Sequence, residues 1–153
     1  MPARILVADD HEVVRQGIRA ILQARPDWNI CGEAVDGRDA IRLAKELRPD
    51  VIIMDITMPV MSGLEASQEI AKLQLPSRIL IFTMHESKSL GPSVRKVGAQ
   101  GYVVKSRAAR DLVDALDRLL AGGTFFDNAS PSGAREDEGP HRDYLLRQAL
   151  SFT

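Results

Sequence analysis

The sequence predicts an α/β protein built on an open, doubly wound parallel sheet. Two observations support this prediction. Short runs rich in Val and Ile recur along the chain, and stretches with helical spacing of apolar residues lie between them. A near-continuous apolar run is typical of a strand buried on both faces. Strands that alternate with helices form βαβ units, and their right-handed crossovers produce a parallel sheet.

The elements follow from these patterns in chain order. A helix is predicted after each strand, and the third helix begins at the capping-box pattern of Ser62 and Glu65. The fourth and fifth helices are predicted over residues 88–97 and 108–121, the latter ending at Gly122. The predicted strands are residues 4–8, 30–34, 51–54, 78–82 and 102–104. Four of the helices have an apolar face that is expected to be buried. In the first helix this face carries Val14, Ile18, Ile21 and Leu22, and in the second Ala40, Ile41, Ala44 and Leu47. In the third it carries Ala66, Ile70 and Leu73, and in the fifth Ala109, Leu112, Val113, Leu116 and Leu120.

The number of elements selects one architecture. Five strands fit an open sheet and are too few for an eight-stranded barrel. We therefore predict a flavodoxin-like (βα)5 fold, with a five-stranded parallel sheet of order 2-1-3-4-5 over residues 1–126. Residues 127–140 are rich in Ser, Pro, Gly and charge and are predicted to form a linker. Residues 141–153 have the composition of a short amphipathic helical tail.

Composition and charge exclude several classes of function. The net charge of −1 gives no bulk attraction to nucleic acid or to an anionic membrane. Cys31 is the only cysteine, which rules out an intrachain disulfide and a zinc site with several thiolates. The N-terminal apolar run reaches Asp9 and Asp10 too early for a secretory signal or a membrane span. We therefore expect a cytoplasmic location.

Chemically useful side chains fall at the carboxyl ends of the predicted strands. Asp9 and Asp10 follow the first strand, and Asp55 ends the third. Thr83 ends the fourth strand and Lys105 follows the fifth. Ligands of open α/β sheets bind at this edge, and the predicted order makes the first and third strands neighbours. We therefore expect three carboxylates to converge, with a hydroxyl and an ammonium opposite them.

Such a cluster predicts a cation and a phosphoryl acceptor. Three close carboxylates repel one another unless a proton or a cation neutralises them. Mg²⁺ suits hard oxygen ligands in a crevice open to water. An aspartate such as Asp55 can act as a nucleophile toward phosphorus, and Lys105 with the metal would stabilise the transferring oxygens. Thr83 can donate a hydrogen bond to an attached phosphoryl group.

These motifs together resemble a response-regulator receiver domain of a two-component system, over residues 4–126. The segments that carry the resemblance are VADDHEVVRQGI, DVIIMDITMPVMSGLEA, ILIFTMHES and GAQGYVVKS. They are most similar to receivers that precede LuxR/FixJ-type helix-turn-helix modules. The resemblance implies that a sensor histidine kinase phosphorylates Asp55. It further implies that Mg²⁺ is held by Asp10, Asp55 and the backbone carbonyl of Thr57, with Asp9 helping through water, and that Lys105 binds the phosphoryl group.

The resemblance also implies how the signal leaves the domain. Thr83 and Tyr102 form a switch pair, in which the hydroxyl moves toward the phosphoryl group while the ring turns inward. The phosphorylated domain would then control a partner protein or an output domain, and dimerise. The residues after Phe126 contain no recognisable helix-turn-helix, so we expect no direct DNA binding by this chain. The protein would catalyse only its own phosphorylation and dephosphorylation.

Less specific interpretations of the same residues stay open. Asp9 and Asp10 could cap a helix, Asp55 could form a turn, and Lys105 could be a solvated strand end. Two rival functions are a phosphorylation-independent scaffold and a small phosphatase with Asp55 as its nucleophile. The phosphatase would need a second acid two residues after Asp55, and Thr57 stands there.

Overall fold

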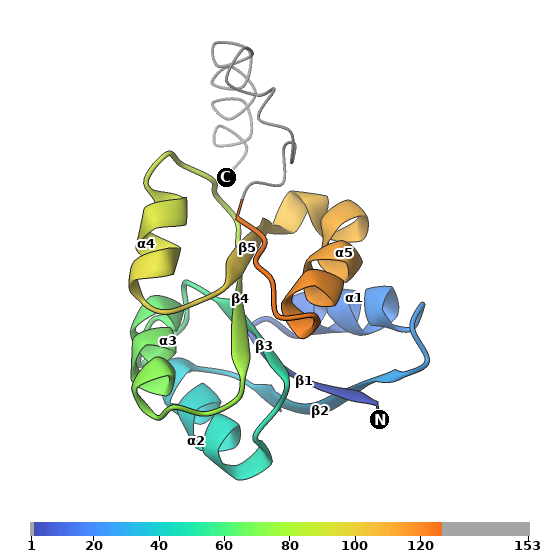
Figure 1. Cartoon of the computed structure of the whole chain (residues 1–153), viewed down its shortest axis with the longest axis horizontal. Coiled ribbons are helices and arrows are strands. Elements are labelled where there is room, and N and C mark those ends of the chain that lie inside the picture. The colour runs from blue at the N-terminus through green and yellow to red at the C-terminus, as the bar shows by residue number, and fades with distance from the viewer. Residues whose placement is uncertain (1, 127–153) are drawn as a thin grey trace.

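Five parallel strands form one sheet in the order β2-β1-β3-β4-β5, as the sequence predicts. The structure, a computed structural model, describes residues 2–126 (Figure 1). The predicted linker over residues 127–140 and the predicted tail over 141–153 lie outside the described residues. The strands are β1 (Ala3–Ala8), β2 (Trp28–Ala34), β3 (Val51–Asp55), β4 (Arg78–Thr83) and β5 (Gly101–Val104).

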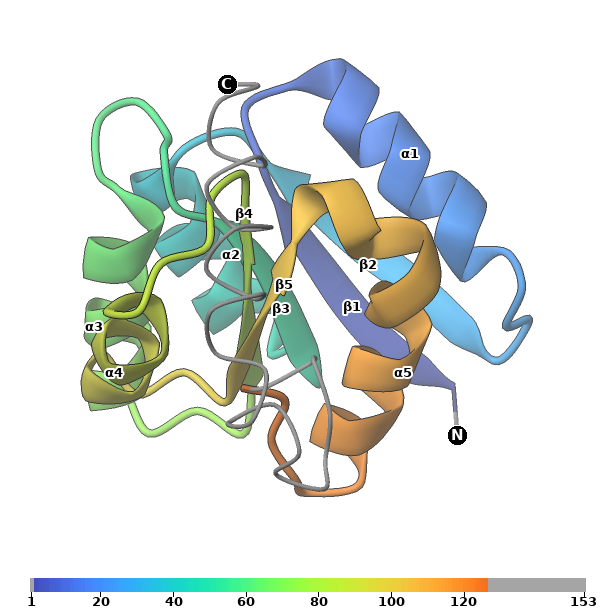
Figure 2. The same ribbon diagram turned by 90° about the horizontal axis from the view of Figure 1, so that it is seen from above.

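Helices cover both faces of the sheet. One face packs against α1 and α5, and the other packs against α2, α3 and α4 (Figures 1 and 2). The helices are α1 (Glu12–Leu22), α2 (Gly37–Leu47), α3 (Gly63–Lys72), α4 (Leu90–Lys96) and α5 (Ala108–Leu120), and a 3₁₀ turn, η1 (Lys105–Arg107), precedes α5. Among the described residues, no helix combines the length and the apolar character needed to cross a bilayer.

The central strands are buried on both faces, which explains their continuous apolar composition. In β3 every residue from Val51 to Asp55 is buried. Alternate side chains enter opposite cores because successive side chains of a strand point to opposite faces. Ile52 and Met54 join the core beneath α2, α3 and α4, whereas Val51 and Ile53 join the core beneath α1 and α5.

The structure corrects three details of the predicted helices. Helix α4 begins at Leu90 rather than at residue 88, and Ser89 is its N-cap. Ala109 is exposed, because the buried stripe of α5 runs through Ala108, Leu112, Ala115, Leu116 and Leu119 instead. Leu73 was expected in the core but is 40% exposed, since α3 ends at Lys72 and Leu73 is only its C-cap.

Candidate functional site

The neighbouring ends of β1 and β3 bring two carboxylates together. Ala8 of β1 pairs with Met54 of β3, so Asp9 and Asp55 occupy the same edge of the sheet. Asp9 is 1% exposed and Asp55 is 4% exposed. Because a buried carboxylate is costly without a partner, this pair requires a nearby cation or proton.

Lys105 provides one such cation. It opens η1 directly after β5, and its side chain is only 11% exposed. The Lys105 Nζ lies 2.9 Å from Asp9 Oδ2 and 3.3 Å from Asp55 Oδ1. The structure thus brings together an acid from β1, an acid from β3 and an ammonium from the end of β5, as the sequence predicts.

The protonation of Asp55 reflects these neighbours. Burial raises the pKa of the Asp55 carboxyl above its ordinary value, and the charge of Lys105 opposes that rise. The charge of Asp9 raises the pKa further, whereas a hydrogen bond from the Thr57 backbone lowers it. An additional positive charge nearby would therefore stabilise the ionised carboxylate of Asp55.

The residues around Asp55 fit a divalent cation. Asp9, Asp10, His11 and Asp55 each offer a ligand atom, and these atoms all lie within 4.8 Å of one another. Asp10 Oδ1 is buried and has no hydrogen-bond donor aligned with it, although His11 Nδ1 lies 3.2 Å away. Three carboxylates with one unsatisfied oxygen are a donor set suited to Mg²⁺.

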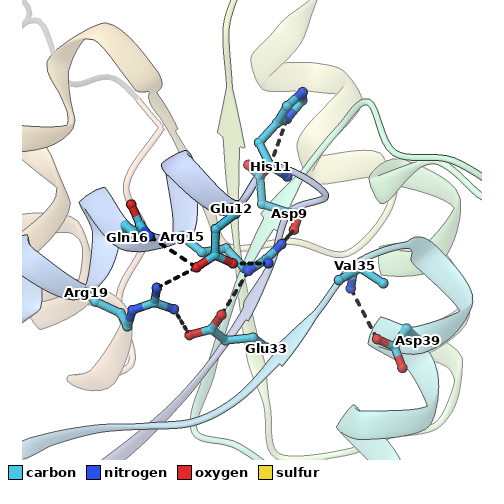
Figure 3. Close-up of polar contacts among 9 residues, drawn as sticks. All are labelled: Asp9, His11, Glu12, Arg15, Gln16, Arg19, Glu33, Val35 and Asp39. Atoms are coloured by element: carbon cyan, nitrogen blue, oxygen red, sulfur yellow. Dashed lines mark hydrogen bonds and ion pairs between the residues drawn. The ribbon is translucent and has the colours of Figure 1, made fainter.

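His11 was not predicted to belong to this cluster. Its Nδ1 lies 3.2 Å from Asp9 Oδ1, and its side chain is 64% exposed (Figure 3). The only sequence signal was its position next to the acidic pair, because no metal-binding spacing marks it.

Thr57 lies in the loop between β3 and α3, where its side chain is exposed. A hydrogen bond links its backbone to Asp55. The start of α3 lies close to the end of β3, because the Gly63 amide donates to Ile56 O at 2.7 Å. A Cβ at Gly63 would lie only 1.8 Å from Asp55 O. Only a glycine leaves room for α3 to begin at this distance from β3.

Thr83 and Tyr102 lie on the neighbouring strands β4 and β5, and both contact the loop that follows β4. Thr83 is buried at the end of β4, and its Oγ1 lies 3.3 Å from the carbonyl oxygen of His85. Tyr102 is 6% exposed, and its hydroxyl donates to Glu86 Oε2 at 2.9 Å. Glu86 also pairs with Arg107 of η1 and is itself buried. Sequence reasoning missed Glu86, because no motif marks a buried acid in a loop.

This sheet, with acids and a lysine at the carboxyl edge of its strands, defines a signalling domain of the two-component type. The chain belongs to the response regulator receiver domain family, whose model matches residues 5–117. Among curated relatives, the transcriptional regulatory protein LiaR of Bacillus subtilis (strain 168) is 41% identical over 119 residues, 78% of this chain and 56% of LiaR. The nitrate/nitrite response regulator protein NarL of Escherichia coli (strain K12) is 37% identical over 128 residues, 84% of this chain and 59% of NarL.

Solved structures agree with this assignment. A two-component response regulator of the LuxR family from Aurantimonas sp. SI85-9A1 has a TM-score of 0.80 and 38% identity, covering 92% of this chain and 99% of that one. The non-phosphorylated receiver domain of the stress response regulator RcsB from Escherichia coli has a TM-score of 0.76 and 28% identity, over 84% of this chain and 100% of that one. The chain spans little more than half the length of its curated relatives. Neither the scaffold nor the phosphatase alternative is favoured by these relatives.

Proposed function

We propose that this chain is a phosphorylation-operated switch in which Asp55 accepts a phosphoryl group from a sensor histidine kinase. The observation that carries this proposal is the position of Asp55, a buried carboxylate 3.3 Å from the Lys105 ammonium and within a cluster of metal-binding atoms. A carboxylate oxygen of Asp55 attacks phosphorus, and the bond from phosphorus to the donor imidazole breaks. The product is an aspartyl phosphate.

Each neighbouring side chain has a role in this transfer. Lys105 binds the oxygens of the phosphoryl group, which its contacts with both buried acids support. Asp10, Asp55 and the backbone carbonyl of Thr57 would hold Mg²⁺, and Asp9 would help through water. Bound Mg²⁺ would supply the positive charge that neutralises the acids and the transferring oxygens.

The switch depends on the charge that phosphorylation adds. A phosphoryl group carries roughly −1.5 to −2 charges at neutral pH. The Thr83 hydroxyl leaves the backbone of His85 and donates to the phosphoryl group. Tyr102, which is already buried against Glu86, responds by repacking. The altered surface then controls a partner protein or an output domain, and favours a homodimer.

The whole protein's partners are inferred from its relatives. Several relatives are transcriptional regulators by name, yet the described residues contain only the receiver fold. We therefore propose that the receiver fold of residues 2–126 does not itself contact DNA. We also propose a cytoplasmic location, as expected from the family.

Labelling with acetyl phosphate tests the proposal directly. Wild type should gain one phosphoryl mass by intact-protein mass spectrometry when Mg²⁺ is present, and EDTA should abolish the gain. Asp55→Asn should remain unlabelled, whereas Asp50→Asn, an exposed acid at the other end of β3, should label normally. Full labelling of the Asp55 variant would disprove the assignment of the acceptor.

A further inference from the structure

One guanidinium connects three elements immediately behind the acidic cluster. Arg15 of α1 is 11% exposed, and its Nη1 donates to the backbone carbonyl of Asp9 at 2.6 Å. Its Nε donates to Glu33 Oε1 of β2 at 2.8 Å, and its Nη2 pairs with Glu12 (Figure 3). The side chain therefore joins the end of β1, the end of β2 and the start of α1.

The contact with Asp9 affects Asp10 through the peptide bond. The carbonyl of Asp9 and the amide of Asp10 belong to one planar peptide unit, so fixing the oxygen fixes the orientation of the plane. Together with the φ angle of Asp10, that plane sets the direction in which the Asp10 side chain leaves the backbone. Asp10 Oδ1 is the buried oxygen without an aligned donor, and its position governs how well the cluster fits a cation.

We propose that Arg15 is a positioning residue, which holds the Asp9–Asp10 turn in the orientation that binds the divalent cation. This inference rests on the proposed function, because it concerns the same acidic site. Arg15 acts from behind the turn through the Asp9 carbonyl, and its guanidinium is already committed to Glu12 and Glu33.

A purely electrostatic role and a positioning role for Arg15 predict opposite changes in Mg²⁺ affinity when Arg15 is removed. Removing a positive charge near an acidic site strengthens cation binding, because less repulsion opposes the incoming ion. Releasing the turn weakens cation binding, because the ligands must be reordered when the cation binds. A loss of Mg²⁺ affinity on removal of Arg15 would therefore identify a positioning role.

The chain offers a matched control one turn along the same helix. Arg19 pairs with the same two acids, at 3.1 Å from Glu12 and in contact with Glu33. Its side chain is 35% exposed. Arg15→Gln and Arg19→Gln remove the same charge and break pairs with the same acids, but only Arg15→Gln removes the contact with the Asp9 carbonyl.

The test is an Mg²⁺ titration of the full chain followed by amide NMR, with apo stability measured by urea unfolding. We expect Arg15→Gln to weaken Mg²⁺ affinity about tenfold, and Arg15→Lys, which keeps the charge, to weaken it as well. Arg19→Gln should leave the affinity unchanged or slightly stronger. Unchanged affinity in both Arg15 variants, or equal weakening in Arg19→Gln, would overturn the inference. Acetyl phosphate labelling of wild type is scored separately, so a failure to label would refute the proposed phosphotransfer without deciding the role of Arg15.

Discussion

The ammonium of Lys105 lies 2.9 Å from the Asp9 carboxylate, although 96 positions separate the two residues in the sequence. The same ammonium lies 3.3 Å from Asp55, so one charge serves two buried acids. In the absence of a phosphoryl group, Lys105 therefore partly neutralises the two acids that a bound metal ion would also neutralise.

Replacing Lys105 should separate metal binding from phosphorylation. In Lys105→Met the repulsion on an incoming divalent cation falls by about 2 kcal/mol at the dielectric constant of water, which is roughly a thirtyfold gain in Mg²⁺ affinity. The initial rate of acetyl phosphate labelling should fall by at least tenfold, because the transferring oxygens lose a binding group. Calorimetry and mass spectrometry measure the two effects. Lys72→Met, which removes an exposed lysine on α3, should change neither quantity.

The sign of the Asp55 pKa shift predicts a pH-dependent stability difference. Burial raises the pKa of Asp55 above 3.8, so ionisation of this group disfavours folding at any pH above the folded-state pKa. That cost disappears as the pH falls below 3.8, where the group is protonated in both states. Asp55→Asn should therefore unfold at higher urea than wild type at pH 7.5 in Mg²⁺-free buffer, and the difference should shrink toward acid pH.

Mg²⁺ provides the matching control for this difference. Saturation at a hundred times the dissociation constant stabilises a folded protein by about 2.7 kcal/mol. Wild type should gain this stability, whereas Asp55→Asn should gain less because it has lost a ligand. A variant that is less stable than wild type at pH 7.5 without Mg²⁺ would show that the pair with Lys105 outweighs burial.

The sequence carried enough information for the sheet order and for the meeting of Asp9, Asp55 and Lys105. Strand ends in a parallel sheet share an edge, and that rule needs no knowledge of side-chain conformations. The sequence pattern could not predict the contact of Glu86 with Tyr102 or the contact of Arg15 with the Asp9 carbonyl. Both depend on long side chains reaching across loops that the apolar pattern does not describe.

Gly63 should be intolerant of even one methyl group. Its Cβ would lie 1.8 Å from the Asp55 backbone oxygen, so Gly63→Ala must push α3 away from β3. We expect a loss of roughly 1–3 kcal/mol in unfolding free energy and slower labelling of Asp55. Gly17→Ala is the control, because nothing lies within 4 Å of its added Cβ. That variant should be more stable by roughly 0.5–1 kcal/mol, since alanine favours a helix interior.

Tyr102 should anchor the loop between β4 and α4 through its hydroxyl. The bond to Glu86 Oε2 is 2.9 Å long and buried, and hydrogen bonds to charged groups contribute roughly 1.5–3 kcal/mol. Tyr102→Phe should lower the unfolding free energy by an amount in that range. Amide exchange over residues 84–89 should accelerate more than exchange in β1. Equal exchange in both proteins would show that the Tyr102 hydroxyl does not hold this loop in place.

Thr57 and His85 should control the lifetime of the phosphorylated state. Each lies two residues beyond a strand-end residue of the site, Asp55 and Thr83 respectively, and both side chains are exposed. They are thus placed to flank the phosphoryl group and to limit the approach of water. Thr57→Ala and His85→Ala should each change the dephosphorylation rate of labelled protein, followed by intact mass after acetyl phosphate is removed. Ser106→Ala, which alters an exposed residue of η1, measures the background variation. If all four proteins lost the label at one rate, neither side chain would control water access.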